Sequence, residues 1–369
     1  FLEELNEEEE VQEEREPVGD PDALPIDAFR EEIIERVNRD RVTIIHGETG
    51  CGKSSRVPVI LLEDAMKHNR PCRMMVSQPR RIAASSLMKR LRTSVGDKVG
   101  LRMGHGVREE CDETRIFFVT TGYLVRLIAH HPGVFYSHTH LIIDEVHERS
   151  VDGDVLCLLA RKLLESHPTL RLILMSATIH TDLYREYFSN QPEDYGALDC
   201  LSVGARRFPV QICHAEDLVV GPNAMKGPFA ASAKRLVSLT ERMRGHGGEQ
   251  ISPSLGKEQY SLVVGLIRQV VRIGTGCLVF VSGMFDIQEL TDRLSDMPEY
   301  RIFGIHSDIP FEEQEAAFLP AGPDEIKVVI ATNAAESSIT LPDVDVVICL
   351  GTHKAMRYFS QTHCVQLVN

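Results

Sequence analysis

Short apolar runs rich in branched side chains alternate with stretches of helical periodicity along most of the chain. In the first half, runs of this kind predict buried strands at residues 42–45, 73–76, 116–120, 141–143 and 172–175. The segments between them repeat apolar residues at the spacing of amphipathic helices. Strands that alternate with helices in this way predict an α/β fold with mostly parallel sheets.

The pattern breaks near residues 204–209, which we interpret as a linker between two domains. A second series follows, with a helix predicted over 260–271 and strands at 277–281, 302–305, 328–330 and 346–349. Residues 220–256 show little periodicity and predict a long loop with one helix at 230–243. A length of 369 residues is enough for two domains, and we place them at 26–205 and 206–369.

The net charge of −14 is unevenly distributed. Residues 1–20 hold ten acidic side chains and one basic one, so this stretch carries −9 and the rest carries −14 − (−9) = −5. We interpret 1–25 as an acidic, solvated and flexible segment; the alternative is that it mimics nucleic acid or binds a basic partner. A body at −5 can still bind RNA through a local basic track.

Composition favours an intracellular protein. The nine cysteines are scattered without a C-x-x-C pair, as expected of reduced thiols. The sequence shows no apolar run of about 18 residues, so no contact with a membrane is expected. A signal peptide is not visible either, although the chain starts at Phe1 without an initiator Met.

A phosphate-loop pattern, G-x-x-x-x-G-K-[ST], lies between the first predicted strand and a helix. It comprises Gly47, Glu48, Thr49, Gly50, Cys51, Gly52, Lys53 and Ser54, and Ser55 follows it. Glycines let backbone N–H groups surround the phosphates of a nucleotide such as ATP, and Lys53 would neutralise them. Ser54 would offer its hydroxyl to Mg²⁺. The alternative, a glycine-rich turn that binds nothing, does not account for the strand, lysine and serine together.

A second candidate, Asp144-Glu145-Val146-His147, follows the strand predicted at 141–143 and lies 91 residues after Lys53 (144 − 53). Ligands bind at the carboxyl edge of open parallel sheets. There Asp144 can hold the magnesium ion, and Glu145 can take part in holding it and polarise the attacking water. The alternative is that both carboxylates merely cap the following helix.

Further strings occur in an order that resembles the DEAH-box/RNA helicase A group of superfamily 2 helicases. Residues 77–84 (S-Q-P-R-R-I-A-A) are similar to motif Ia of that group, 120–124 to motif Ib, 144–149 to motif II, 176–178 to motif III, 278–283 to motif IV and 331–340 to motif V. The resemblance covers roughly residues 26–369. It implies two tandem RecA-like P-loop domains with the nucleotide between them and nucleic acid across both.

The resemblance also implies roles for individual residues. Contacts to RNA are implied for Arg80, Arg81, Thr121, Gly283, Thr332 and Asn333. Ser176 and Thr178 would couple the γ-phosphate to the strand-binding face, and His147 would report the nucleotide state at the domain interface. The family stacks the base between an arginine and a phenylalanine, here Arg90 and Phe318, so other NTPs would be accepted beside ATP. Phe318 could instead be an ordinary core residue.

Some positions depart from the family pattern. Arg56 replaces a glutamine, and the end of motif V differs from the common pattern around Asp343, the candidate ribose contact. Motif VI, Q-R-x-G-R-x-G-R, does not occur in this sequence, and residues 351–369 are similar to the β-hairpin that precedes it. We therefore expect a truncated second domain. Because an arginine finger contributes about 10³–10⁵ in rate, we also expect this segment alone to turn nucleotide over poorly.

The expected function is that of an NTP-dependent RNA helicase or ribonucleoprotein remodeller that moves 3′ to 5′ on single-stranded RNA. A protein activator or a larger complex is an expected partner. Two alternatives remain open at this point: a catalytically weak, helicase-like scaffold subunit of a ribonucleoprotein, and a DNA helicase. The intact Lys53, Asp144 and Glu145 argue against the scaffold.

Overall fold

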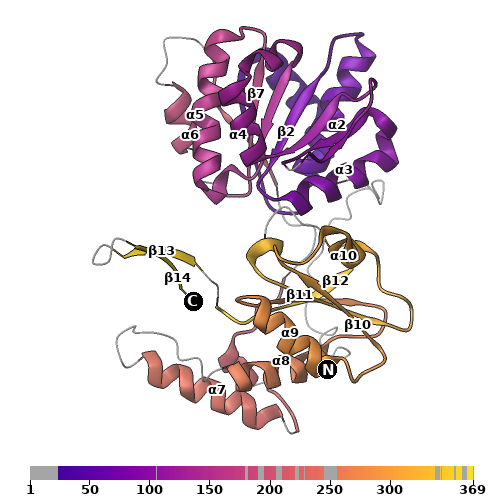
Figure 1. Ribbon diagram of the computed structural model, residues 1–369, viewed down its shortest axis with the longest axis vertical. Coiled ribbons are helices and arrows are strands. Elements are labelled where there is room, and N and C mark those ends of the chain that lie inside the picture. The colour runs from indigo at the N-terminus through magenta and orange to yellow at the C-terminus, as the bar shows by residue number, and fades with distance from the viewer. Residues whose placement is uncertain are drawn as a thin grey trace, which may run out of the picture.

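The computed structural model describes residues 24–104, 106–178, 182–189, 195–204, 210–220, 224–227, 229–244, 256–336, 341, 343–352, 355–359 and 364–368. Figure 1 shows two α/β units, the first in indigo to magenta above the second in orange to yellow. Residues 1–23 of the acidic segment lie outside the described residues, so its interpretation stays a prediction. Among the described helices, none combines the length and apolarity needed to cross a membrane.

The first unit is built on an eight-stranded sheet in the order β4-β3-β5-β2-β6-β7-β1-β8. Its neighbours pair in parallel except β3 with β4, which are antiparallel. The strands are β1 (Val42–Gly47), β2 (Met74–Gln78), β3 (Val99–Arg102), β4 (Arg108–Glu109), β5 (Ile116–Thr120), β6 (His140–Ile143), β7 (Arg171–Ser176) and β8 (Cys200–Val203). The five strands predicted in this half are confirmed.

Three strands of the first sheet were not predicted from the sequence: β3, β4 and β8, which lie toward its two edges. They are short, and Gly100 interrupts the apolar pattern of β3. That glycine is required by packing, since a Cβ atom there would lie 2.7 Å from the carbonyl oxygen of Glu109 on β4. Gly100 therefore weakens the sequence signal for β3 and also allows β4 to pack closely against β3.

Helices cover both faces of the first sheet. One apolar cluster joins the sheet to α1 (Arg30–Arg39), α2 (Lys53–Lys67) and α3 (Arg81–Val95). A second cluster joins the opposite face to α4 (Thr121–His130), α5 (Val151–Ser166) and α6 (Asp182–Ser189). Alternation along each strand divides the two faces: Ile45 packs in the first cluster and its neighbour Ile44 in the second. Short 3₁₀ turns complete the unit: η1 (Pro25–Phe29), η2 (Gly96–Lys98), η3 (Pro132–Ser137) and η4 (Val146–Glu148).

The second unit contains a four-stranded parallel sheet in the order β10-β11-β9-β12. Its elements are η5 (Ala215–Leu218), α7 (Phe229–Arg244), α8 (Gly256–Val270), β9 (Gly276–Phe280), α9 (Met284–Leu294), β10 (Tyr300–Ile305), α10 (Phe311–Glu315), η7 (Ala316–Phe318), β11 (Ile326–Ala331), η8 (Asn333–Ala335) and β12 (Val344–Cys349). Helices α8 and α9 pack on one face of the sheet, and α7 packs on α8. The four strands and two helices predicted in this half are confirmed.

A separate antiparallel pair, β13 (Ala355–Phe359) and β14 (Cys364–Val368), follows the second sheet. Figure 1 shows this pair standing apart from both sheets, to the left of the second unit. The β-hairpin predicted within residues 351–369 is therefore confirmed.

Helix α3 of the first unit contacts the second unit. The side chain of Ile82 packs in the cluster that contains Ile305 and Ala331, and Lys89 forms an ion pair with Glu315 of α10. The last strand of the first sheet ends at Val203. The exact domain boundary between residues 205 and 206 stays a prediction.

Two histidines at the start of β6, the buried His138 and the half-buried His140, are expected to make the stability of the first unit depend on pH. Burial is the main cause that lowers the pKa of His138 and of His140 from 6.5 to about 4. Both rings are therefore neutral in the folded chain at pH values where the unfolded chain already binds their protons. The resulting stabilisation is complete above pH 6.5 and is lost as the pH falls from 6.5 toward 4.

We expect the free energy of unfolding to decrease by about 1–2 kcal/mol per histidine between pH 7 and pH 5, as measured by urea denaturation. His138 packs against the rings of Phe117 and Phe135, so His138→Phe replaces it with an aromatic ring that does not titrate. This variant should show a smaller pH dependence. If His138→Phe leaves the pH dependence of the unfolding free energy unchanged, His138 is not one of its causes.

Candidate active site

The phosphate loop connects β1 to α2 through two glycines in left-handed conformations, Gly50 at φ 87° and Gly52 at φ 99°. Lys53 is the first residue of α2 and is buried at 5% exposure. Its ammonium group donates to the carbonyl oxygen of Gly47 and to that of Glu48, the latter at 3.2 Å. These bonds turn the charge back toward the loop, where the phosphates of a nucleotide would bind.

The segment before α1 braces the phosphate loop from outside. The backbone N–H of Ile26 donates to the carbonyl oxygen of Cys51 at 3.1 Å. Asp27 accepts from the N–H of Leu24 at 2.9 Å and from Nε of Arg56 at 2.6 Å. Arg56, which departs from the family pattern, thus ties this segment to the first turn of α2.

We expect Gly52→Ala to weaken nucleotide binding strongly, with Gly50→Ala as the matched control. Both positions have positive φ, which costs a residue with a side chain about 1–2 kcal/mol. Only at Gly52 would the new Cβ also meet neighbours, Leu24 Cδ1 at 2.8 Å and Ile26 Cγ2 at 3.0 Å, whereas at Gly50 the space is open. Titration with a fluorescent ATP analogue should show the larger loss for Gly52→Ala; equal losses would contradict the bracing role.

Asp144 lies directly after β6 and is 4% exposed. Its carboxylate accepts hydrogen bonds from Nε2 of Gln78 at 2.7 Å and from the N–H of Glu145 at 2.9 Å, and the Ser54 hydroxyl lies beside it. Burial is the main cause that raises the pKa of Asp144, and the Ser54 hydroxyl, the bond from Gln78 and the charge of Lys53 act against it. These donors stabilise the ionised form that a metal site requires.

The residues around Asp144 fit a magnesium ion bound together with a nucleotide. Mg²⁺ prefers oxygen ligands and usually takes one or two from the protein, with the rest from water and phosphate. The Ser54 hydroxyl and the carboxylate of Asp144 lie beside each other at the end of the phosphate loop. Glu145 adjoins them in a left-handed conformation at φ 55° that begins the turn η4.

Gln78 is a functional candidate that the sequence analysis did not single out. It ends β2, the strand next to β6, and its amide holds the carboxylate of Asp144. In the sequence, only its place at the start of the Q-P-R-R string points to a function. Its contact with Asp144 depends on the pairing of β2 with β6, which brings the two strand ends together.

His147 joins the loop after β6 to the loop after β7. Its Nδ1 accepts a hydrogen bond from the N–H of Ala177 at 3.2 Å, and the N–H of Thr178 donates to Oγ of Ser176 at 3.2 Å. Burial is the main cause that lowers the pKa of His147, in agreement with a neutral ring whose Nδ1 accepts. The 3.5 Å approach of this nitrogen to Glu145 is therefore not an ion pair. The expected role of His147 at the domain interface stays a prediction.

The candidate RNA contacts of the first unit share one edge with the phosphate-binding residues. Arg80 and Arg81 follow β2, and Thr121 follows β5, which pairs with β2. On the other side of β2 lie the ends of β6, β7 and β1, which carry Asp144, Ser176 and the phosphate loop. Arg81 is exposed, whereas Thr121 is buried at the N-terminus of α4. A contact near Thr121 would therefore come from backbone N–H groups.

The candidate contacts of the second unit also lie at strand ends. Gly283 follows β9, and Thr332 and Asn333 follow the neighbouring strand β11. Asp286 shapes the first loop by accepting from the N–H of Gly283 at 3.1 Å. Asn333 is exposed and Thr332 is buried at 7% exposure.

The proposed base-stacking residues lie on elements that the structure brings together. Arg90 is exposed on α3, one residue after Lys89, whose partner Glu315 lies three residues before Phe318. Phe318 is half-buried and packs against the apolar cluster on the second sheet. The alternative role of Phe318 as a packing residue is thus partly realised, and stacking with Arg90 stays a prediction.

Asp343, the candidate ribose contact, has two partners within the second unit. One carboxylate oxygen pairs with the buried ammonium group of Lys327, and the other accepts from the N–H of Ala321 at 2.6 Å. Both oxygens help to hold the start of β12 against β11 and the loop before it, and a carboxylate oxygen can accept more than one hydrogen bond. A ribose contact at Asp343 stays a prediction.

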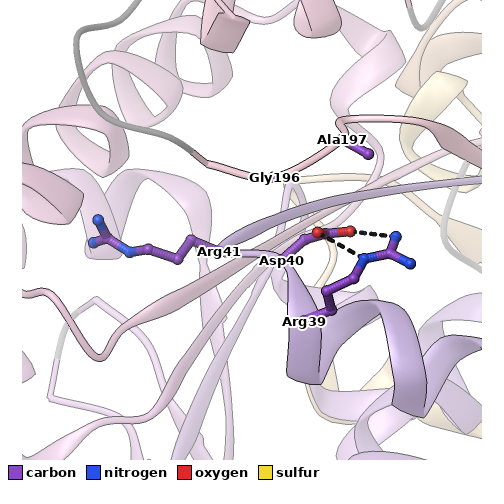
Figure 2. A pocket seen from close by; sticks show the side chains of 5 residues that line it. All are labelled: Arg39, Asp40, Arg41, Gly196 and Ala197. Carbon is purple, nitrogen blue, oxygen red and sulfur yellow. Dashed lines mark hydrogen bonds and ion pairs between the residues drawn. The ribbon is translucent and has the colours of Figure 1, made fainter.

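A hollow lined by Arg39, Asp40, Arg41, Gly196 and Ala197 lies elsewhere on the first unit. Figure 2 shows that Arg39 faces Asp40, to which it donates two hydrogen bonds, and that Arg41 points away. Asp40 and Arg41 directly precede β1, whereas the phosphate loop directly follows it. The hollow therefore lies at the opposite edge of the sheet and is not part of the candidate active site.

Comparison with known proteins gives two family matches. Residues 27–185 match the DEAD/DEAH box helicase family, and residues 259–367 match the helicase conserved C-terminal domain. One similar protein is the DExH-box ATP-dependent RNA helicase DExH1 of Arabidopsis thaliana, which is 31% identical over 91% of this chain and 37% of the relative. Another is the human ATP-dependent RNA helicase DHX29, which is 31% identical over 94% of this chain and 29% of the relative. The chain thus spans about a third of the length of these relatives.

A solved structure supports the fold. The crystal structure of the Escherichia coli DEAH/RHA helicase HrpB matches with a TM-score of 0.67 and 24% sequence identity, over 94% of this chain and 39% of that one. The likeness confirms the predicted arrangement of two RecA-like α/β domains.

Proposed function

This chain belongs to the DEAD/DEAH box helicase family, and on that premise we propose that it is an NTP-dependent RNA helicase or ribonucleoprotein remodeller. It would bind ATP together with Mg²⁺ and would also accept other NTPs. Hydrolysis would drive movement on single-stranded RNA from 3′ to 5′. The observation that carries this proposal is the continuous strand edge of the first unit, on which phosphate-binding and candidate RNA-binding residues adjoin.

The residues at this edge divide the chemical work. Lys53 would neutralise the β- and γ-phosphates, and Ser54 with Asp144 would hold the Mg²⁺, which when bound withdraws charge from the phosphate oxygens. Glu145 would orient and polarise the attacking water. The hydrogen bond between His147 and Ala177 would pass a change at the γ-phosphate to the loop that contains Ser176 and Thr178.

RNA would be gripped mainly through its phosphates. Arginine is suited to this because its planar guanidinium group binds a phosphate bidentately, as proposed for Arg80 and Arg81. The loop after β9 and the exposed Asn333 after β11 of the second unit would continue the track. Such contacts give little sequence preference, so the RNA target would be chosen by other parts of an assembly or by an activating protein.

We also propose an intracellular location. Eight cysteines that the structure describes are free thiols, as is usual in reducing compartments. The nucleus, the cytoplasm and the organelles are all compatible with this argument.

The proposal is tested by measuring the binding of labelled single-stranded RNA and DNA of the same sequence, with and without a non-hydrolysable ATP analogue and Mg²⁺. We expect RNA to bind more tightly than DNA and the analogue to change RNA affinity. Stronger binding of DNA would favour a DNA helicase. No binding of either nucleotide or RNA would overturn the proposal and favour a scaffold.

A further inference from the structure

We propose that Glu148 is a positioning residue that occupies Arg80 until an RNA phosphate displaces it, and that this exchange links RNA binding to the turn that carries Glu145. The inference rests on the proposed function. It assigns a regulatory role at that same site to an ion pair between the loops after β2 and β6. The two residues are 68 positions apart in the sequence.

The ion pair is placed where a phosphate can reach it. Nη1 of Arg80 lies 3.3 Å from Oε1 of Glu148, and the two side chains are 24% and 22% exposed. Arg80 is the residue just before α3 and has an extended backbone. The pair is therefore accessible to an incoming strand, yet less screened than a fully exposed pair.

Glu148 is connected to the candidate catalytic carboxylate through a short, closed turn. It ends η4, and its N–H donates to the carbonyl oxygen of Glu145 at 3.0 Å. Left-handed residues bound the turn on both sides, Glu145 at φ 55° and Arg149 at φ 50°. In the middle, His147 is bonded to Ala177. A displacement of the Glu148 side chain thus acts on a turn with few alternative conformations.

The charges make the exchange reversible. A phosphate offers Arg80 the same type of oxygen acceptors as a carboxylate, so the arginine can change partners without losing its charge-assisted hydrogen bonds. The released carboxylate of Glu148 and the phosphate repel each other, so RNA binding would push Glu148 away from Arg80. Glu148 therefore lowers RNA affinity and makes the conformation of the turn at Glu145 sensitive to RNA.

The test compares RNA binding by wild-type protein and Glu148→Gln, measured by fluorescence anisotropy. Because accessible ion pairs contribute modestly, we expect Glu148→Gln to bind single-stranded RNA about 2–5-fold more tightly. The matched control is Asp154→Asn, which removes the same charge from a nearby pair: Asp154 accepts from Nε of Arg149 at 2.9 Å and does not hold Arg80. We expect its RNA affinity to stay closer to that of the wild type.

A double-mutant cycle shows whether the effect passes through Arg80. In an Arg80→Ala background, Glu148→Gln should no longer increase RNA affinity beyond the effect of Asp154→Asn. A second readout is the change in affinity for a fluorescent ATP analogue on addition of RNA, which Glu148→Gln should reduce and Asp154→Asn should retain. A merely structural role of Glu148 would not alter this coupling selectively.

The outcomes separate this inference from the proposed function. If wild-type protein binds RNA and Arg80→Ala weakens binding, but Glu148→Gln behaves as Asp154→Asn in both readouts, the inference alone is overturned. If the wild-type protein does not bind RNA, both the proposed function and this inference are overturned. An increase caused by Glu148→Gln that persists in the Arg80→Ala background would also overturn the exchange.

Discussion

Replacing Lys53 with alanine is expected to weaken the binding of Mg-ATP about 100-fold or more. Hydrogen bonds to charged groups contribute about 1.5–3 kcal/mol each, and the ammonium group of Lys53 would make at least two to the phosphates. Its burial at 5% exposure strengthens these interactions because water screens them little. The variant also leaves the loop carbonyls of Gly47 and Glu48 without their donor. Titration with a fluorescent ATP analogue measures the effect.

The control for this substitution is Lys67→Ala at the other end of the same helix. Lys67 is the exposed last residue of α2, so the variant loses the same charge without touching the phosphate loop. We expect its ATP affinity to match that of the wild type. Equal affinities for Lys53→Ala and Lys67→Ala would show that the loop does not bind the triphosphate.

Glu145→Gln is expected to slow ATP hydrolysis by about 10²–10⁴-fold, the usual contribution of a general base, while ATP binding changes little. Glutamine has the size of glutamate and tolerates the same left-handed backbone, so the turn η4 should keep its form. The lost charge removes the group that would polarise the attacking water. Single-turnover experiments with protein in excess over ATP measure the rate of the hydrolysis step itself.

Glu165→Gln is the matched control for charge, since Glu165 is exposed near the end of α5, 17 residues after the end of η4 (165 − 148). Its single-turnover rate should equal that of the wild type. If Glu145→Gln instead weakened ATP binding as much as it slowed hydrolysis, Glu145 would act in holding the Mg-nucleotide complex and not in activating water.

Local signals were sufficient for most of the fold. The central strands are continuous apolar runs buried on both faces, and the phosphate loop and the Asp144 segment each follow such a run. The edge strands β4 and β8, and β3 beside β4, have no comparable signal because they are short and their pairing depends on neighbours. For β3, Gly100 is explained only by the approach of Glu109.

The side-chain partners that complete the site were not accessible from the sequence. Gln78 and Asp144 are 66 residues apart, and Lys89 and Glu315 are 226 apart, so nothing in their spacing predicts a contact. For Asp343, its place in a motif predicts a ligand contact but not the two partners that the structure gives it, Lys327 and the backbone of Ala321. Spacing predicts which loop a residue is on, whereas packing decides what it binds.

The brace formed by residues before α1 sets a limit on how this protein can be shortened or fused. Ile26 is fully buried, and Leu24 and Asp27 hold the outer side of the phosphate loop through Gly52 and Arg56. A chimera that took this nucleotide site from α1 onward would include every residue of the G-x-x-x-x-G-K-S string and still lack its support. The transplantable unit therefore begins at or before Leu24.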